Sequence, residues 1–68
     1  MTAKVAFTVE VYGNWCSGYF FEIKRKGSER TIKSWGPYES QCKAFEDGLV
    51  WCRENDYFLE SEENPYAD

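Results

Sequence analysis

The spacing of apolar residues changes once along this chain, and this change constrains the fold more than any other feature. In residues 4–12 a valine or phenylalanine occupies every odd position from 5 to 11, and residues 19–26 alternate in the same way. A period of two is typical of strands that bury one face. Residues 30–35 are a third, shorter candidate strand, in which Ile32 is expected on the buried face and Trp35 on the other.

Turn signals separate the three candidate strands. Gly13 and Gly18 bracket the first connection, and Gly27-Ser28 marks the second. Because both connections are short, neighbouring strands are expected to be antiparallel. Gly36-Pro37 is expected to end the sheet and to precede a helix, where the missing amide hydrogen of proline is tolerated.

From residue 38 onward the period becomes helical. Apolar side chains recur at i, i+4, i+7, i+11 and i+14, which is one face of an α-helix. These residues are Tyr38, Cys42, Phe45, Leu49 and Cys52. Asn55 is expected to end the helix. Gly48 lies inside it, at a cost of about 1 kcal/mol relative to alanine, so we expect the helix to approach the sheet closely there.

The sequence therefore predicts an α+β fold of β-β-β-α order, in which a three-stranded antiparallel sheet carries one helix on one face. A chain of 68 residues has room for one core. Residues 1–59 are predicted to form this domain, with residues 57–59 folding back over an edge of the core. Residues 60–68 are acidic and are broken by Pro65, which predicts a mobile or loosely docked tail.

This layout resembles the small β-β-β-α modules of plant AP2 DNA-binding domains and of the arm-binding domains of phage integrases. The resemblance covers roughly residues 5–54 and rests on the arrangement of GYFFEI, RTIKSW and PYESQCKAFEDGLVW. In overall character the chain is also similar to small acidic phage-encoded inhibitors such as anti-CRISPR proteins. That similarity implies a protein that occupies the surface of a host factor, including one that normally binds nucleic acid.

Charge is segregated along the chain. Residues 1–52 carry seven Lys or Arg and six Asp or Glu, a net of +1, whereas residues 53–68 carry one Arg and six Asp or Glu, a net of -5. The two parts sum to the formal net charge of -4. The acidity thus belongs to the helix end and the tail, while the hairpin of residues 24–33 is basic.

The sheet face that the helix leaves uncovered is the predicted binding surface. Exposed aromatic rings beside cations are typical of contact surfaces. By the alternation, this face carries Tyr12, Phe20 and Trp35, flanked by Lys24 and Lys33. Negative charge in the tail is expected to steer the chain toward a basic protein surface. The residues concerned are Glu60, Glu62 and Glu63. We therefore predict a protein-binding module that acts as an inhibitor by covering its partner's surface.

Three alternatives stay open. The first is that residues 57–59 shield the rings, which then have no binding role. The second is a nucleic-acid-binding module that uses the open face and the hairpin, although a net charge of -4 disfavours contact with a polyanion. Its phosphate contacts would be Lys24, Arg25, Lys26, Arg30 and Lys33. The third is a homodimer, because a short chain gains from burying more apolar area.

Catalytic and metal chemistry are not predicted. The chain has no histidine, which removes the commonest general base and metal ligand. Cys16, Cys42 and Cys52 are widely spaced and odd in number, which favours free thiols over a disulfide framework or a zinc site. No apolar run approaches the roughly 18 residues of a membrane span. We expect a cytoplasmic protein without catalytic residues, cofactor or metal.

Overall fold

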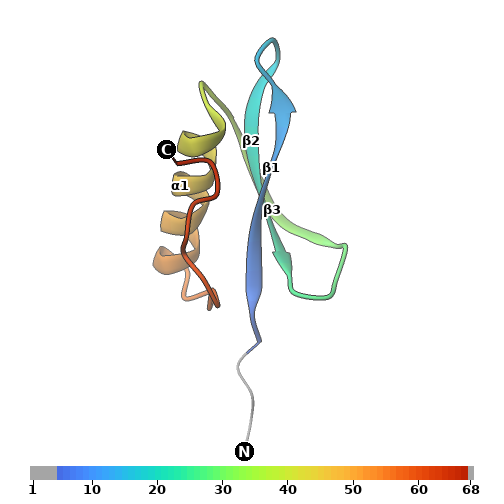
Figure 1. Cartoon of the computed structure of the whole chain (residues 1–68). Helices are drawn as coiled ribbons and strands as arrows, with labels where there is room; N and C mark the ends of the chain where they lie inside the picture. Colours follow the sequence, from blue (N-terminus) through green and yellow to red (C-terminus); the bar gives the residue numbers. More distant parts are fainter. Residues whose placement is uncertain (1–4, 68) are drawn as a thin grey trace, which may run out of the picture.

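The computed structural model describes residues 5–67, and it has the predicted β-β-β-α order. Its elements are β1 (Phe7–Asn14), β2 (Gly18–Arg25), β3 (Thr31–Tyr38) and α1 (Gln41–Glu54). The strands form one antiparallel sheet in the order β1-β2-β3, and α1 covers one face of it (Figure 1). The predicted fold class is confirmed. Lys4, the predicted start of the first strand, and Asp68 lie outside the described residues.

The turn between β1 and β2 is fixed by its own polar groups. Asn14 Oδ1 accepts hydrogen bonds from the amides of Cys16 and Ser17, at 2.9 and 2.8 Å. Gly13 and Gly18 flank the turn with φ of 107° and 95°, a region of backbone space that strains any residue with a side chain. The turn therefore lies where the two glycines predicted it.

The central strand β2 contributes the middle of the core. Phe21 and Ile23 are buried beneath α1, as the alternation predicted. Removing one large apolar side chain of this kind from water stabilises a fold by roughly 1.5–3 kcal/mol. The helix contributes Ala44, Phe45, Leu49 and Cys52 to the same core.

α1 is placed by its caps and by one glycine. The hydroxyl of Ser40 accepts a hydrogen bond from the amide of Lys43, which caps the first turn, and Asn55 ends the helix as predicted. A Cβ atom on Gly48 would lie 2.6 Å from Val9 Cγ1, so the predicted close approach to the sheet is confirmed. The helix begins three residues later than predicted, at Gln41 instead of residue 38.

The late helix start reflects a longer third strand. β3 continues through Gly36 and Pro37 to Tyr38, so the prediction that these residues end the sheet is wrong. The peptide bond between Gly36 and Pro37 is cis. Proline is tolerated here because β3 is an edge strand, where one side of the backbone needs no partner in the sheet.

A β-bulge at Ile32 reverses the side-chain directions predicted for Lys33 and Trp35. Lys24 pairs with Thr31 whereas Ile23 pairs with Lys33, so Ile32 is an extra residue with no partner on β2. Ile32 is 42% exposed, and its predicted place in the core is wrong.

The residues after the bulge point to the helix side of the sheet. Lys33 pairs with buried Ile23, and Trp35 pairs with buried Phe21. Directly paired residues on antiparallel strands point to the same face. The prediction that Lys33 and Trp35 lie on the uncovered face is therefore wrong, because period-two alternation does not continue across a bulge.

The segment after the helix returns to the sheet and covers an edge of the core, as predicted. The amide of Phe7 donates to the carbonyl oxygen of Phe58 at 2.9 Å, and Phe7 forms a parallel bridge with Leu59. The Tyr57 ring packs against Phe7 and Trp51, with ring centroids 4.6 and 5.1 Å apart.

The acidic segment of residues 60–67 runs along α1 toward the N-terminal end of the helix (Figure 1). Its contacts with the helix include an ion pair in the last turn, a hydrogen bond to the backbone of the first turn and an aromatic pair. They join Glu62 to Arg53, Asn64 to the carbonyl of Cys42, and Tyr66 to Phe45.

Candidate functional site

A polar network occupies much of the open face, defined as the sheet face away from α1. Lys24 Nζ lies 3.2 Å from Glu22 Oε1 and 3.5 Å from Glu10 Oε2. The hydrogen bond to Glu22 and the negative charge of Glu10 raise the pKa of Lys24. Thr31 Oγ1 donates a second hydrogen bond to Glu22 at 2.9 Å. Lys24, one of the predicted contact residues, is therefore already neutralised by two carboxylates.

Tyr12 and Phe20 lie on the open face as predicted, but they are engaged with each other. Their rings are stacked, with centroids 5.3 Å apart and planes 14° from parallel. The Tyr12 hydroxyl forms a 2.6 Å hydrogen bond with the hydroxyl of Ser34. Phe20 lies over Gly36, where an added Cβ would come within 2.6 Å of its ring. Tyr12 is 47% exposed and Phe20 is half-buried, so this pair offers a small, flat apolar area.

A concave surface with both apolar and charged side chains lies on the other side of the sheet, between the edge strand β3 and α1. This β3–α1 groove has a volume of about 330 Å³, and Phe21 forms part of its lining. Trp35 is 60% exposed on its sheet wall, and Val50 is 42% exposed on its helix wall. The remaining lining residues are Lys33, Tyr38, Asp47, Trp51 and Glu54.

The polar groups of the β3–α1 groove divide between its two ends. At one end, burial and a hydrogen bond to Asp47 raise the pKa of Tyr38, and Lys43 Nζ lies 3.5 Å from Asp47 Oδ1. At the other end, Lys33 Nζ lies 5.0 Å from the centroid of the Trp35 ring.

Glu54, on the helix wall, differs from the other charged residues of the groove. Its carboxylate forms neither an ion pair nor a hydrogen bond with any of residues 5–67. The groove therefore combines exposed apolar side chains with one carboxylate that has no partner among residues 5–67.

The predicted binding residues do not form one surface. Tyr12, Phe20 and Lys24 lie on the open face, whereas Lys33 and Trp35 line the β3–α1 groove. Two of the three predicted steering carboxylates are engaged within the chain. Glu60 pairs with Lys26 at 2.6 Å, Glu62 pairs with Arg53 at 2.7 Å, and Glu63 has no ion pair among residues 5–67.

The basic hairpin does not gather its cations on one surface. Lys24 and Lys33 point to opposite faces of the sheet, and Lys26 is paired with Glu60. Arg25 and Arg30 are exposed and form no ion pair within the described part of the chain. The hairpin therefore does not present a cluster of five cations to a phosphate backbone, and the support for phosphate binding is weaker than the sequence indicated.

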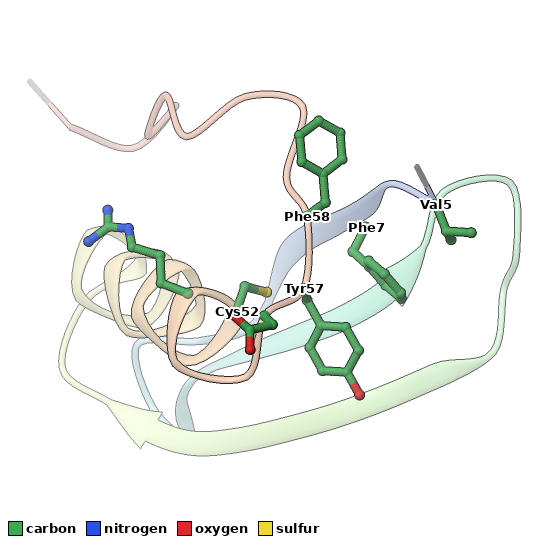
Figure 2. A pocket seen from close by; sticks show the side chains of 7 residues that line it. Val5, Phe7, Cys52, Tyr57 and Phe58 are labelled. Atoms are coloured by element: carbon green, nitrogen blue, oxygen red, sulfur yellow. The ribbon is translucent and has the colours of Figure 1, made fainter. Parts of the chain in front are cut away.

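A second pocket, of about 470 Å³, opens at the C-terminal end of α1 (Figure 2). Its wall is mainly apolar, with Val5, Phe7, Tyr57 and Phe58 around the buried thiol of Cys52. Burial, with a further contribution from the charge of Glu62, raises the pKa of Cys52 to about 11. The thiol is therefore protonated at neutral pH, when it is a poor nucleophile. Arg53 and Asp56 complete the lining, and the guanidinium of Arg53 is held by Glu62.

All three cysteines are free thiols: Cys16 is exposed, Cys42 half-buried and Cys52 buried. Among residues 5–67, no three Cys, Asp or Glu side chains are grouped so that they could hold a metal ion. In the same part of the chain, the helix lacks the length and apolarity needed to cross a membrane.

Sequence reasoning missed the helix wall of the β3–α1 groove and one exposed ring. Val50 and Glu54 are four residues apart, so the helical period places them on one strip of α1. The same period could not indicate that this strip borders the edge of β3. Trp15, which is 86% exposed in the turn between β1 and β2, was also missed, although a Trp between two turn glycines is a usable signal of exposure.

No protein-family model, curated protein or solved structure matches this chain.

Proposed function

We propose that this chain is a protein-binding module without catalytic activity, which inhibits its partner by covering part of the partner's surface. The contact site in this proposal is the β3–α1 groove. The observation that carries it is Trp35, which is 60% exposed beside half-exposed Val50 on one concave surface. Large rings in such settings are enriched among the residues that dominate protein–protein affinity.

The shape of the groove favours a protein partner over a small metabolite. Small-molecule sites usually enclose most of their ligand in about 300–1,000 Å³ and present several converging polar groups. The β3–α1 groove is at the lower end of this range, at about 330 Å³, and it lies along the exposed edge of the sheet. A side chain projecting from another protein fits such a site better than a molecule that must be enclosed.

Charge also favours a protein over a nucleic acid. The formal net charge is -4, and two of the five cations of the basic hairpin are bound to carboxylates of this chain. Phosphate binding would have to break these pairs and would meet repulsion at long range.

Two tryptophan variants test the proposal. Trp35→Ala removes the exposed ring of the groove, whereas Trp15→Ala removes a more exposed ring from the distant turn and serves as a matched control. Loss of a central interface Trp weakens binding by about 2 kcal/mol or more, which is roughly 30-fold. We expect immobilised wild type and Trp15→Ala to retain the same partner from extracts of the source cells, and Trp35→Ala to lose it.

Circular dichroism spectra must first show that both variants are folded. Retention of the same proteins by all three chains would refute the assignment of the site to the groove. Retention of nucleic acid by wild type, lost at high salt, would refute the proposed class of partner.

A further inference from the structure

Glu54 lies in the last turn of α1, where a carboxylate is unfavourable. The last carbonyl groups of a helix have no partner within the helix and carry partial negative charge. Asp56, two residues later, also has no ion pair with any of residues 5–67, but it lines the second pocket and not the groove. Arg53, the basic residue of this turn, is engaged with Glu62 instead. Within residues 5–67, Glu54 is therefore a carboxylate of the groove with which no cation forms an ion pair.

The spacing between the apolar and acidic parts of the groove is defined by the helix. Val50 and Glu54 are four residues apart, which is a rise of about 6 Å along α1. On the opposite wall, Trp35 and Lys33 are two strand residues apart, about 6.6 Å. In an extended segment, side chains at i and i+2 point the same way with this same spacing of about 6.6 Å.

Lys33 is the cation that faces the groove near this end. β3 and α1 are antiparallel, because the chain reverses direction at residues 39–40. Lys33 and Glu54 therefore lie toward the same end of the groove, yet they form no ion pair. The ammonium group is drawn over the Trp35 ring, 5.0 Å from its centroid, and so toward the apolar part of the groove. The remaining charged lining residue, Asp47, is occupied by Tyr38 and Lys43.

From these observations we infer that the β3–α1 groove takes an extended segment of a partner protein with the pattern apolar-x-basic. The apolar side chain lies between Trp35 and Val50, and the Lys or Arg two residues away pairs with Glu54. This inference rests on the proposed function and specifies the partner's chemistry.

A second copy of the chain is a poorer occupant of the groove. The edge of β3 carries a bulge at Ile32, a lysine and Pro37, three features that discourage pairing between strand edges. Trp35, at 60% exposure, offers roughly 100–150 Å² of apolar area, whereas a stable interface buries about 800 Å² on each partner. The groove suits a short segment better than a whole subunit.

A peptide titration followed by amide chemical shifts tests the inference. The probe is the blocked peptide acetyl-Ser-Thr-Leu-Thr-Arg-Thr-Ser-amide, and its two control peptides carry Glu in place of Arg, or Ser in place of Leu. We expect saturable shifts for residues 33–35 and 50–54 on titration to about 5 mM, and at least about fivefold weaker binding of both control peptides.

Two charge variants test the role assigned to Glu54. Glu54→Gln should weaken binding of the Arg peptide by about two- to fivefold and should remove its advantage over the Glu peptide. Lys33→Met should leave binding unchanged or strengthen it by about twofold, because the residue that repels the incoming cation is gone. Both residues are on the surface, so both variants are expected to fold.

Three outcomes would overturn the inference: no saturable shift, shifts centred on Tyr12 and Phe20, or equal binding of the Arg and Glu peptides. A change from monomer to dimer that alone accounts for the shifts would overturn it in favour of a second copy. These failures differ from failure of the proposed function. If Trp35→Ala abolishes partner capture while the basic peptide does not bind, the groove is the site and the chemistry assigned to its occupant is wrong.

Discussion

Gly48 lies where α1 comes closest to the sheet, and replacing it with alanine tests how tightly the two layers are packed. On helix propensity alone, Gly48→Ala should stabilise the protein by about 1 kcal/mol. The structure predicts the opposite sign. The added methyl group would lie 2.6 Å from Val9 Cγ1 and 3.2 Å from Phe21 Cβ and Cγ, closer than carbon atoms pack without repulsion.

The size of the effect follows from what can move. Val9 is β-branched and has few alternative rotamers, and Phe21 is buried beneath the helix, so the helix itself must shift away from the sheet. Overpacking of a core costs about 1–3 kcal/mol, and the gain in helix propensity offsets about 1 kcal/mol of that. We expect Gly48→Ala to destabilise the protein by about 1 kcal/mol, equivalent to a fall in Tm of roughly 4–8 °C for a domain of this size.

A double-mutant cycle separates the clash from other effects. In a Val9→Ala background the nearest obstacle is absent, and Gly48→Ala should then be neutral or stabilising. We expect a coupling energy of about 1–2 kcal/mol, measured by urea unfolding of the four chains followed by circular dichroism. Stabilisation by Gly48→Ala in the wild-type background, or equal effects in both backgrounds, would show that the helix does not lie as close to Val9 as described.

Three further predictions concern the helix cap, a buried thiol and the docked tail. Ser40→Ala should lower the free energy of unfolding by about 1 kcal/mol in urea titrations, whereas Ser40→Asp, which can also accept from the Lys43 amide, should not. The pKa of Cys52 is raised from 9.0 to about 11, so between these pH values the unfolded chain loses the thiol proton while the folded chain keeps it. The Cys52 contribution to stability should therefore fall by up to about 2–3 kcal/mol from pH 9 to 11. Cys52→Ala should remove this part of the slope and leave the part that comes from the raised pKa values of Tyr38 and Lys24, even if the protein is less stable throughout. Tyr66→Ala should loosen the tail and speed the reaction of Cys42 with a disulfide reagent, without changing the rate at exposed Cys16; equal rates at Cys42 would count against docking.

The parts of the fold that depend on uninterrupted periodicity could be predicted from the sequence. β2 is the central strand, and one of its faces lies under the helix, so Phe21 and Ile23 are buried. Because β2 is regular at these positions, alternation alone assigned both side chains to the correct face. Gly48 is informative for a similar reason, because a glycine inside a regular helix needs a compensating contact. In both cases local pattern and tertiary packing favour the same structure.

Prediction failed where the chain breaks its period. Ile32 reads as a core residue in a regular strand, but nothing local in RTIKSW distinguishes a regular strand from a bulged one. The sequence predicted a mobile or loosely docked tail but could not indicate where it docks, because Tyr66 and Asn64 make single long-range contacts that have no repeat in the sequence. The unrecognised bulge also affected the predicted binding surface, because Trp35 was assigned to the open face by alternation alone.

The two irregularities of β3 together create the wall of the β3–α1 groove. The bulge at Ile32 turns Lys33 and Trp35 to the helix side of the sheet. Trp35 and Tyr38 are three residues apart, which in a regular strand would put them on opposite faces of the sheet. A second register shift separates the pair Phe21–Trp35 from the pair Tyr19–Tyr38, and it keeps Tyr38 on the helix side as well. A regular strand would have placed Trp35 on the flat open face and left the groove without its largest apolar side chain. Bulges occur preferentially at sheet edges and beside functional sites, where they redirect a side chain, and β3 fits both conditions if the groove is the binding site.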